Sequence, residues 1–140
     1  MNWKLILQLS LFGLAMGIGT VFFISSNLEP FFWLVIFVVS AYMIATRATG
    51  RYFLHGLFVG IANSVWITAT HVALFDAYVA RHPKEVAMMA SMPLPTHPRL
   101  MMALTGPVIG VLSGLVLGVF AIIASKLVKR APSNAPRTTG

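Results

Sequence analysis

The sequence of 140 residues contains no cysteine and only three acidic residues, and charged residues of both signs make up 9% of it. Without cysteine there is no disulfide framework and no thiolate site for a metal or a redox reaction. Soluble domains carry about 25% charged residues, and a soluble chain of this size needs more polar surface to cover its core. The low charge therefore excludes an ordinary soluble domain.

Catalytic and cofactor motifs are also missing. The sequence contains no G-x-S-x-G, no H-E-x-x-H and no phosphate-binding loop. The net charge of +7 comes from Lys and Arg residues that stand singly or in pairs at the edges of apolar runs, where such residues set membrane topology and contact lipid headgroups. No basic folded face is apparent. We therefore predict no catalytic residues, no cofactor and no nucleic-acid binding.

Long apolar runs dominate what is present. The chain is 58% hydrophobic, with a mean hydropathy of +0.85. Four runs are long enough to cross roughly 30 Å of hydrocarbon as helices, and the first lacks an A-x-A cleavage site, which favours a retained helix over a signal peptide. We predict an all-α integral membrane four-helix bundle as one domain over residues 1–130, with a disordered tail at 131–140. The predicted helices cover about 4–25, 28–46, 52–79 and 99–128.

Glycines recur on one face of the predicted fourth helix. They are spaced four residues apart, at Gly106, Gly110, Gly114 and Gly118. Another backbone can approach such a stripe closely, because it has no side chains. The first and third helices have similar small faces, built around Gly13, Gly17, Gly56 and Gly60. We predict that these three helices pack along their glycines, with the bulky second helix peripheral in lipid. The alternative use of the stripe is a pore or sliding surface.

Polar residues gather on one face of the predicted third helix. The candidate intramembrane polar site consists of Asn63, Ser64, Thr70 and His71. His71 is the strongest single candidate, because an ionisable group at membrane depth is a functional hypothesis by default. The alternative is a neutral imidazole that hydrogen-bonds across the bundle. Haem ligation by His55 and His71 is disfavoured, because it needs a histidine from a second helix.

The connection between the predicted third and fourth helices is rich in methionine and proline. Its sulfur and imidazole side chains are Met88, Met89, Met92, Met101, Met102, His82 and His97. Thioether and imidazole ligands suit Cu(I). Methionine is also an ordinary hydrophobic residue, and the spacing here is irregular. We therefore predict no metal site, with copper binding as the alternative.

Lys and Arg residues are distributed unevenly between the two sides of the predicted bundle. Seven belong to the N-terminus, the second connection and the C-terminal end, whereas three belong to the third connection. Cytoplasmic segments are enriched in Lys and Arg. Both termini are therefore predicted to be cytoplasmic, and the methionine-rich connection is predicted to face outward.

The layout resembles a family of small four-helix bacterial inner-membrane proteins known only as a domain of unknown function. The resemblance rests on a long third helix from Tyr52 through Gly60 to Tyr78, followed by His82-Pro83, a methionine-containing stretch and a glycine-bearing last helix that ends in lysines. It implies a multi-pass protein of the bacterial cytoplasmic membrane and supplies no site residues.

Two functions remain open at this point. We predict a non-enzymatic structural, assembly or accessory subunit that acts through helix packing and its outward loop. Its partners would be the lipid bilayer and either further copies of the chain or other membrane subunits. The alternative is a small oligomeric transporter or channel with a polar path along the third helix.

Overall fold

The computed structural model describes residues 1–128, and these form six α-helices without a strand. The helices are α1 (Trp3–Phe22), α2 (Glu29–Arg47), α3 (Tyr52–Ala73), α4 (Phe75–Arg81), α5 (Pro83–Met89) and α6 (Pro98–Leu127). The predicted all-α fold is confirmed, whereas the predicted count of four helices is wrong. The predicted disordered tail lies outside the described residues.

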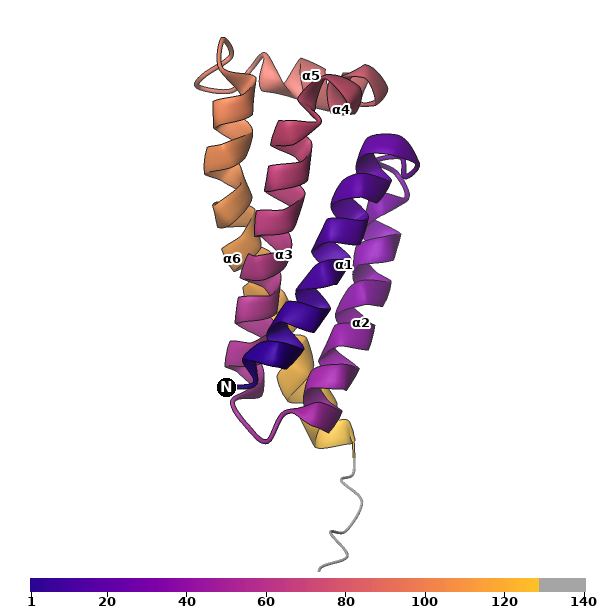
Figure 1. The fold of residues 1–140 in the computed structure, drawn as a ribbon, viewed down its shortest axis with the longest axis vertical. Coiled ribbons are helices and arrows are strands. Elements are labelled where there is room, and N and C mark those ends of the chain that lie inside the picture. The colour runs from indigo at the N-terminus through magenta and orange to yellow at the C-terminus, as the bar shows by residue number, and fades with distance from the viewer. Residues whose placement is uncertain (129–140) are drawn as a thin grey trace, which may run out of the picture.

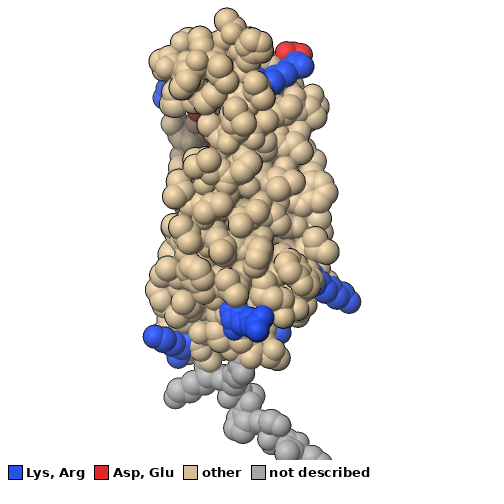
Figure 2. Space-filling view, turned by 90° about the vertical axis from the view of Figure 1, so that its left-hand side faces the viewer, with Lys and Arg blue, Asp and Glu red and all other residues tan. Residues whose placement is uncertain are grey.

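Four of these helices, α1, α2, α3 and α6, are long and apolar enough to cross a membrane by length and composition. They run side by side along the long axis of the molecule (Figure 1). The start of α1 and the end of α6 lie at the same end of the bundle (Figure 1). On the face drawn in Figure 2, Lys and Arg gather at the two ends, and the surface between them is almost free of charge.

The two additional helices replace the upper part of the predicted third helix. That helix was expected to reach residue 79, but α3 ends at Ala73, and Leu74 leaves the helical region with φ −104° and ψ 32°. No glycine or proline marks this break, so the sequence pattern gave no warning of it. The later break is conventional, because Pro83 occupies the first turn of α5, where proline is well tolerated.

Helices α4 and α5 lie across one end of the bundle, at the top of Figure 1. We call residues 75–97, together with the start of α6, the cap. Arg81 ties the cap to α1, since its Nη1 donates to the Phe22 carbonyl at 2.6 Å. Arg99 ties α6 to α4 through an ion pair with Asp76 at 3.0 Å, and its guanidinium lies 5.1 Å from the centre of the Phe75 ring.

The closest helix contact in the bundle joins α3 to α6. A Cβ added to Gly56 would lie 2.6 Å from the Gly118 Cα, and a Cβ added to Gly60 would overlap the Gly114 Cα. The two backbones therefore touch along these four glycines, which we call the glycine seam. Such close approach favours van der Waals packing between helices, which drives their association where hydrophobic burial cannot.

The other glycines of the stripe face side chains instead of backbone. A Cβ on Gly110 would overlap the Ser64 hydroxyl, and one on Gly106 would overlap the Thr68 hydroxyl. On the other side of α3, a Cβ on Gly13 would lie 2.5 Å from the Asn63 Cα. Helix α3 is therefore contacted by glycines of α1 on one side and of α6 on the other.

Helix α2 is the least buried of the four long helices. Its buried residues are confined to its second half: Ser40, Ala41, Ile44 and Ala45. There it joins a hydrophobic cluster with residues of α1, α3 and α6, among them Leu9, Val59 and Leu117. The first half of α2 contributes no buried residue. This half of α2 borders a cavity that α3 and α6 also line.

Candidate functional site

The four residues of the predicted polar site do not form one continuous path. Asn63 and Ser64 line a cavity between α3, α2 and α6. His71 instead contacts Thr20 of α1, and Thr70 lies against Gly17 of the same helix. Asn63 also contacts α1, because its Oδ1 accepts from the Gly13 amide, so three of the four residues lie against α1 and Ser64 instead meets Gly110 of α6.

His71 belongs to a column of stacked rings near the cap. Its Nε2 lies 2.8 Å from the Thr20 hydroxyl, and its ring centre lies 4.3 Å from that of Tyr78. Tyr78 in turn stacks on His82 at 4.2 Å, and the His82 Nδ1 bonds the Tyr78 carbonyl at 2.8 Å. These contacts give His71 a hydrogen-bonded position within the bundle.

The charges of two acidic side chains, Glu85 and Glu29, affect Tyr78 in this column. Burial, together with the smaller effects of the Glu85 and Glu29 charges, raises the pKa of Tyr78 to about 12. Tyr78 is therefore a neutral phenol at physiological pH. A hydrogen bond from the Ser26 side chain lowers the pKa of Glu85, with burial as a smaller opposing effect. Glu85 is therefore ionised at neutral pH.

His55 lies at the opposite end of α3 and has a structural environment. The backbone amide of Asn2 donates to its Nε2 at 3.0 Å, so its Nδ1 is the donor to the Arg51 carbonyl at 2.9 Å. Both ring nitrogens are thus engaged in hydrogen bonds that hold the start of α1 against the start of α3.

The cavity between α2, α3 and α6 has a volume of about 330 Å³. Its lining residues are Glu29, Trp33 and Phe37 from α2, Gly60, Asn63, Ser64, Ile67 and Thr68 from α3, and Gly106, Ile109 and Ser113 from α6. The three residues from α2 are spaced four apart, so they share one face of that helix. We call this space the α2 cavity.

One charged group lies in the α2 cavity, the half-buried carboxylate of Glu29. The Trp33 indole Nε1 donates to it at 3.2 Å, which holds the two side chains of this helical turn together. Within residues 1–128 the ion pair joins Arg99 and Asp76, so it does not involve Glu29. Glu29 thus gives an otherwise uncharged, mostly apolar cavity a negative end.

Asn63 is a second distinctive group in the α2 cavity. It is 2% exposed, and its Oδ1 accepts a hydrogen bond from the Gly13 amide at 3.0 Å. Because an amide N–H requires an acceptor, this bond fixes the orientation of the side chain. Its Nδ2 is buried and has no hydrogen-bond partner. An unsatisfied donor of this kind is rare in folded proteins and calls for an explanation.

The five methionines of the connection also come together. All of them line a smaller pocket of about 180 Å³ beneath α5. The two histidines considered with them do not, since His82 stacks on Tyr78 and His97 bonds Thr96. Within residues 1–128 no group of three or more His, Asp or Glu side chains is arranged to hold a metal ion.

Comparison with known families identifies the chain. The model of the phage Ash protein family matches residues 15–100, which is more than half of the sequence. The chain belongs to the Ash protein family. No curated protein matches it, and neither does any solved structure.

This finding corrects the resemblance drawn from the sequence. The chain was compared with small four-helix bacterial inner-membrane proteins of unknown function, and that resemblance was wrong, because the match is to the Ash family. The resemblance rested on helix layout, which unrelated membrane proteins share. The Ash match spans the second half of α1, the helices α2 to α5 and the first residues of α6. It therefore covers the α2 face, Asn63 and most of the cap.

Sequence reasoning missed the contribution of α2. Glu29, Trp33 and Phe37 repeat every four residues, and this spacing was a usable signal of a shared face. The helix was instead expected to be a featureless surface in lipid. Asn63 and Ser64 were singled out as polar residues, but the pattern could not tell which neighbouring helix each of them faces.

Proposed function

We propose that this member of the Ash family is a non-enzymatic, multi-pass membrane protein whose α2 cavity binds a lipophilic organic cation. The observation that carries the proposal is a largely apolar cavity with a single carboxylate, Glu29, and a buried amide nitrogen without a hydrogen-bond partner, Asn63 Nδ2. Both termini would face the cytoplasm of the cell in whose membrane it resides.

The membrane setting is supported by four helices of sufficient length and hydropathy. It is also supported by the positions of the charges at the ends of the bundle (Figure 2). Lys4, Arg47, Arg51 and Lys126 all belong to the starts or ends of helices at the end of the molecule that holds the N-terminus (Figure 1). An excess of basic residues on one side is the usual mark of the cytoplasmic side.

The preference for a cation follows from the lining of the cavity. It contains one carboxylate and no basic residue, so the potential inside it is negative. The rings of Trp33 and Phe37 share the helix face with that carboxylate, and aromatic faces attract cations. The volume of about 330 Å³ lies within the range of small-molecule sites, roughly 300–1,000 Å³. A lipid-soluble cation would satisfy the charge and the apolar walls together.

Asn63 adds a second requirement for the ligand, a hydrogen-bond acceptor. Its Nδ2 is a donor without an acceptor, and a buried donor left unpaired costs about 1–3 kcal/mol. The Nδ2 atom is itself buried, so a ligand acceptor such as a carbonyl, ether or ester oxygen would reach it after a small movement of the cavity wall and would then remove that cost. The expected ligand is therefore a cationic amphiphile with a neutral acceptor in its apolar part.

The accessory-subunit function remains a prediction. Small helix faces left free for a partner would support it, but most of the glycines are in contact within the chain. The glycines at 56, 60, 114 and 118 contact each other, and those at 13 and 17 contact α3. The transport alternative also changes, because only Asn63 and Ser64 of the four polar residues line the α2 cavity. A transported molecule would enter by the cavity instead of following one polar stripe.

A binding measurement tests the proposal. The full chain in lipid nanodiscs is titrated with tetraphenylphosphonium and, separately, with tetraphenylborate, which has the same shape and the opposite charge. We expect the cation alone to bind. Glu29→Gln should weaken it about tenfold, the change that about 1.4 kcal/mol produces.

Asp76→Asn is the matched control. It removes one acidic charge from the same end of the molecule, at a side chain that is 89% exposed and outside the cavity. Its affinity for the cation should equal that of the wild type. Equal binding of the cation and the anion, or equal losses in the two variants, would overturn the assignment of Glu29 as the cation-binding group.

A further inference from the structure

We propose that the cap contains a thioether site for a soft monovalent metal ion, of which Cu(I) is the biological example. The site is the pocket beneath α5, and it is separate from the α2 cavity. The proposal therefore stands independently of the ligand assigned to that cavity.

Most of the methionines in the chain line this pocket. Its lining residues are Tyr78, Glu85, Met88, Met89, Met92, Pro98, Met101, Met102 and Thr105. These include five of the eight methionines in the sequence. Met88 is 59% exposed and stands at the rim, whereas the other four methionines are half-buried.

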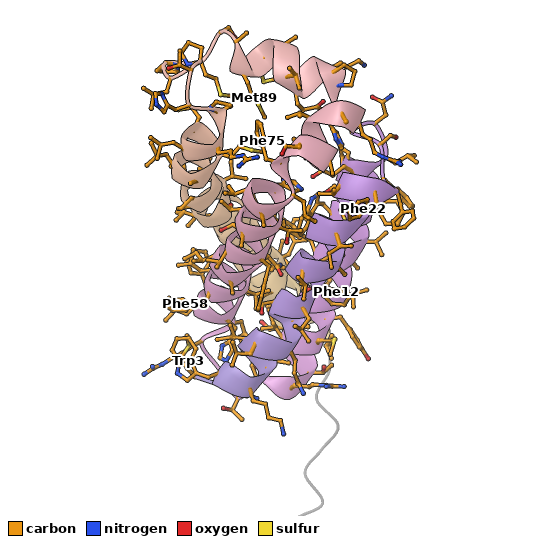
Figure 3. All side chains as sticks on the ribbon, turned by 45° about the horizontal axis from the view of Figure 1, so that its top comes forward. Trp3, Phe12, Phe22, Phe58, Phe75 and Met89 are labelled. Atoms are coloured by element: carbon orange, nitrogen blue, oxygen red, sulfur yellow. The ribbon has the colours of Figure 1, made fainter. Side chains whose placement is uncertain are left out.

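The fold brings these four thioethers together from two separate segments. Met89 ends α5 and Met92 follows in the next turn, whereas Met101 and Met102 belong to the first turns of α6. The turns of residues 90–97 connect α5 to Pro98 at the start of α6, and the two pairs of methionines line a common space. In Figure 3 the Met89 side chain lies at the cap end of the bundle, as does Phe75.

The donor set selects the type of metal. Thioether sulfur is a soft ligand that prefers Cu(I) over hard divalent ions, and it is neutral, so it binds without losing a proton. The pocket contains no histidine, since His82 and His97 have other partners. Zinc and other imidazole-preferring ions therefore lack suitable ligands here. The Glu85 carboxylate at the pocket supplies one negative charge, which matches a monovalent cation.

The remaining space argues that these methionines do more than fill a gap. Methionine is flexible and usually closes irregular spaces in a core. Here four half-buried methionines leave a pocket of about 180 Å³ between them. A single ion is much smaller than this space, so the flexible thioethers would turn inward onto it, and the bound ion would then bridge α5 and α6 and fix the cap on the bundle.

Metal titration of the full chain in lipid nanodiscs tests the site. Cu(I), kept reduced without oxygen, is titrated in competition with a chromogenic Cu(I) chelator, and Ag(I) serves as a redox-inert substitute. We expect one ion per chain and sulfur neighbours in X-ray absorption spectra. Loss of a supporting residue lowers metal affinity roughly 10- to 100-fold, so the double variant Met89→Leu, Met101→Leu should lose at least as much.

Met43→Leu is the matched control, because Met43 lies in the second half of α2, far from the cap. Leucine has nearly the volume of methionine, so the cap variant should keep its fold, which its thermal unfolding in the absence of metal checks. Absence of Cu(I) binding to the wild type would overturn the proposal. Equal losses of affinity in the cap variant and the Met43 variant would overturn it as well.

Discussion

Helix α3 meets α6 in two different ways along its length, and the contrast explains where this molecule is rigid and where it has space. At the glycine seam, Gly56 and Gly60 touch Gly118 and Gly114 backbone to backbone. Closer to the cap, α6 continues the same four-residue spacing with Gly110 and Gly106, but the partners on α3 are now serine and threonine. A stripe that is uniform in sequence is therefore not uniform in contact.

The contacts of α2 with the bundle also change between these two places. Beside the seam, α2 buries Ala41 and Ile44 against the bundle. Beside the serine and threonine, it presents Glu29, Trp33 and Phe37 to an open cavity. Where glycines face each other the two backbones touch, whereas at Gly106 and Gly110 the side chains of Thr68 and Ser64 fill the contact, and the α2 cavity lies beside it. The following predictions test this contrast, beginning with the largest expected effect.

Gly60→Leu should be the most damaging substitution. Its side chain would have to occupy the position of the Gly114 backbone, and backbone has no alternative rotamer. We expect a loss of about 3 kcal/mol or more in the free energy of unfolding, measured in detergent micelles by denaturant titration. Gly114→Leu should behave in the same way, because its Cβ would lie 2.6 Å from the Leu57 carbonyl oxygen. The control Val111→Leu, on the exposed side of α6, should leave stability within about 0.5 kcal/mol.

Asn63→Ala should have the next largest effect. It removes the acceptor of the Gly13 amide and leaves a cavity, so we expect a loss of about 1–2 kcal/mol. Ser40→Ala is the contrasting control, because Ser40 is fully buried and its hydroxyl has no partner. Removing that hydroxyl should leave stability unchanged or raise it. If both variants lost the same free energy, the hydrogen bond to Gly13 would not be the reason.

His71 and Thr20 should show a smaller but measurable coupling. Their side chains lie 2.8 Å apart within the bundle, and hydrogen bonds between membrane helices average about 0.6 kcal/mol. A double-mutant cycle with His71→Phe and Thr20→Val measures this coupling. A value near zero would show that the position of His71 is set by ring stacking on Tyr78 and not by its bond to α1.

Arg99 and Asp76 should contribute least. Their side chains are 54% and 89% exposed, and exposed ion pairs are worth between about 0 and 1 kcal/mol. We expect Asp76→Asn to change stability by less than about 0.5 kcal/mol, and the change should shrink further in high salt. A loss comparable to that of Asn63→Ala would mean that the cap is held chiefly by this pair.

Much of the architecture followed from the sequence, for reasons that are physical. Four long apolar runs cannot fold as soluble strands or loops, so the all-α fold was accessible from hydropathy alone. The break at Leu74 was not, because neither glycine nor proline signals it and the turn into the cap depends on packing. The number of helices was underestimated for that reason.

The candidate site was less accessible than the fold. Asn63 and Ser64 were recognised because polar residues are conspicuous in an apolar helix. That these two residues line the α2 cavity whereas Thr70 and His71 do not depends on how α2 and α6 pack on α3, and helical periodicity does not contain that information. The methionines were noticed as a group, yet their convergence on one pocket depends on the turns of residues 90–97.

The measurement that tests the central claim most directly is ligand protection of single cysteines, for which the cysteine-free chain is well suited. Ser113 lines the α2 cavity, and Ser125 lies on the same helix with a similar hydroxyl bond to its own backbone. Tetraphenylphosphonium should slow alkylation of Ser113→Cys and leave Ser125→Cys unaffected. Equal protection of both positions, or of neither, would contradict a cation site in the α2 cavity.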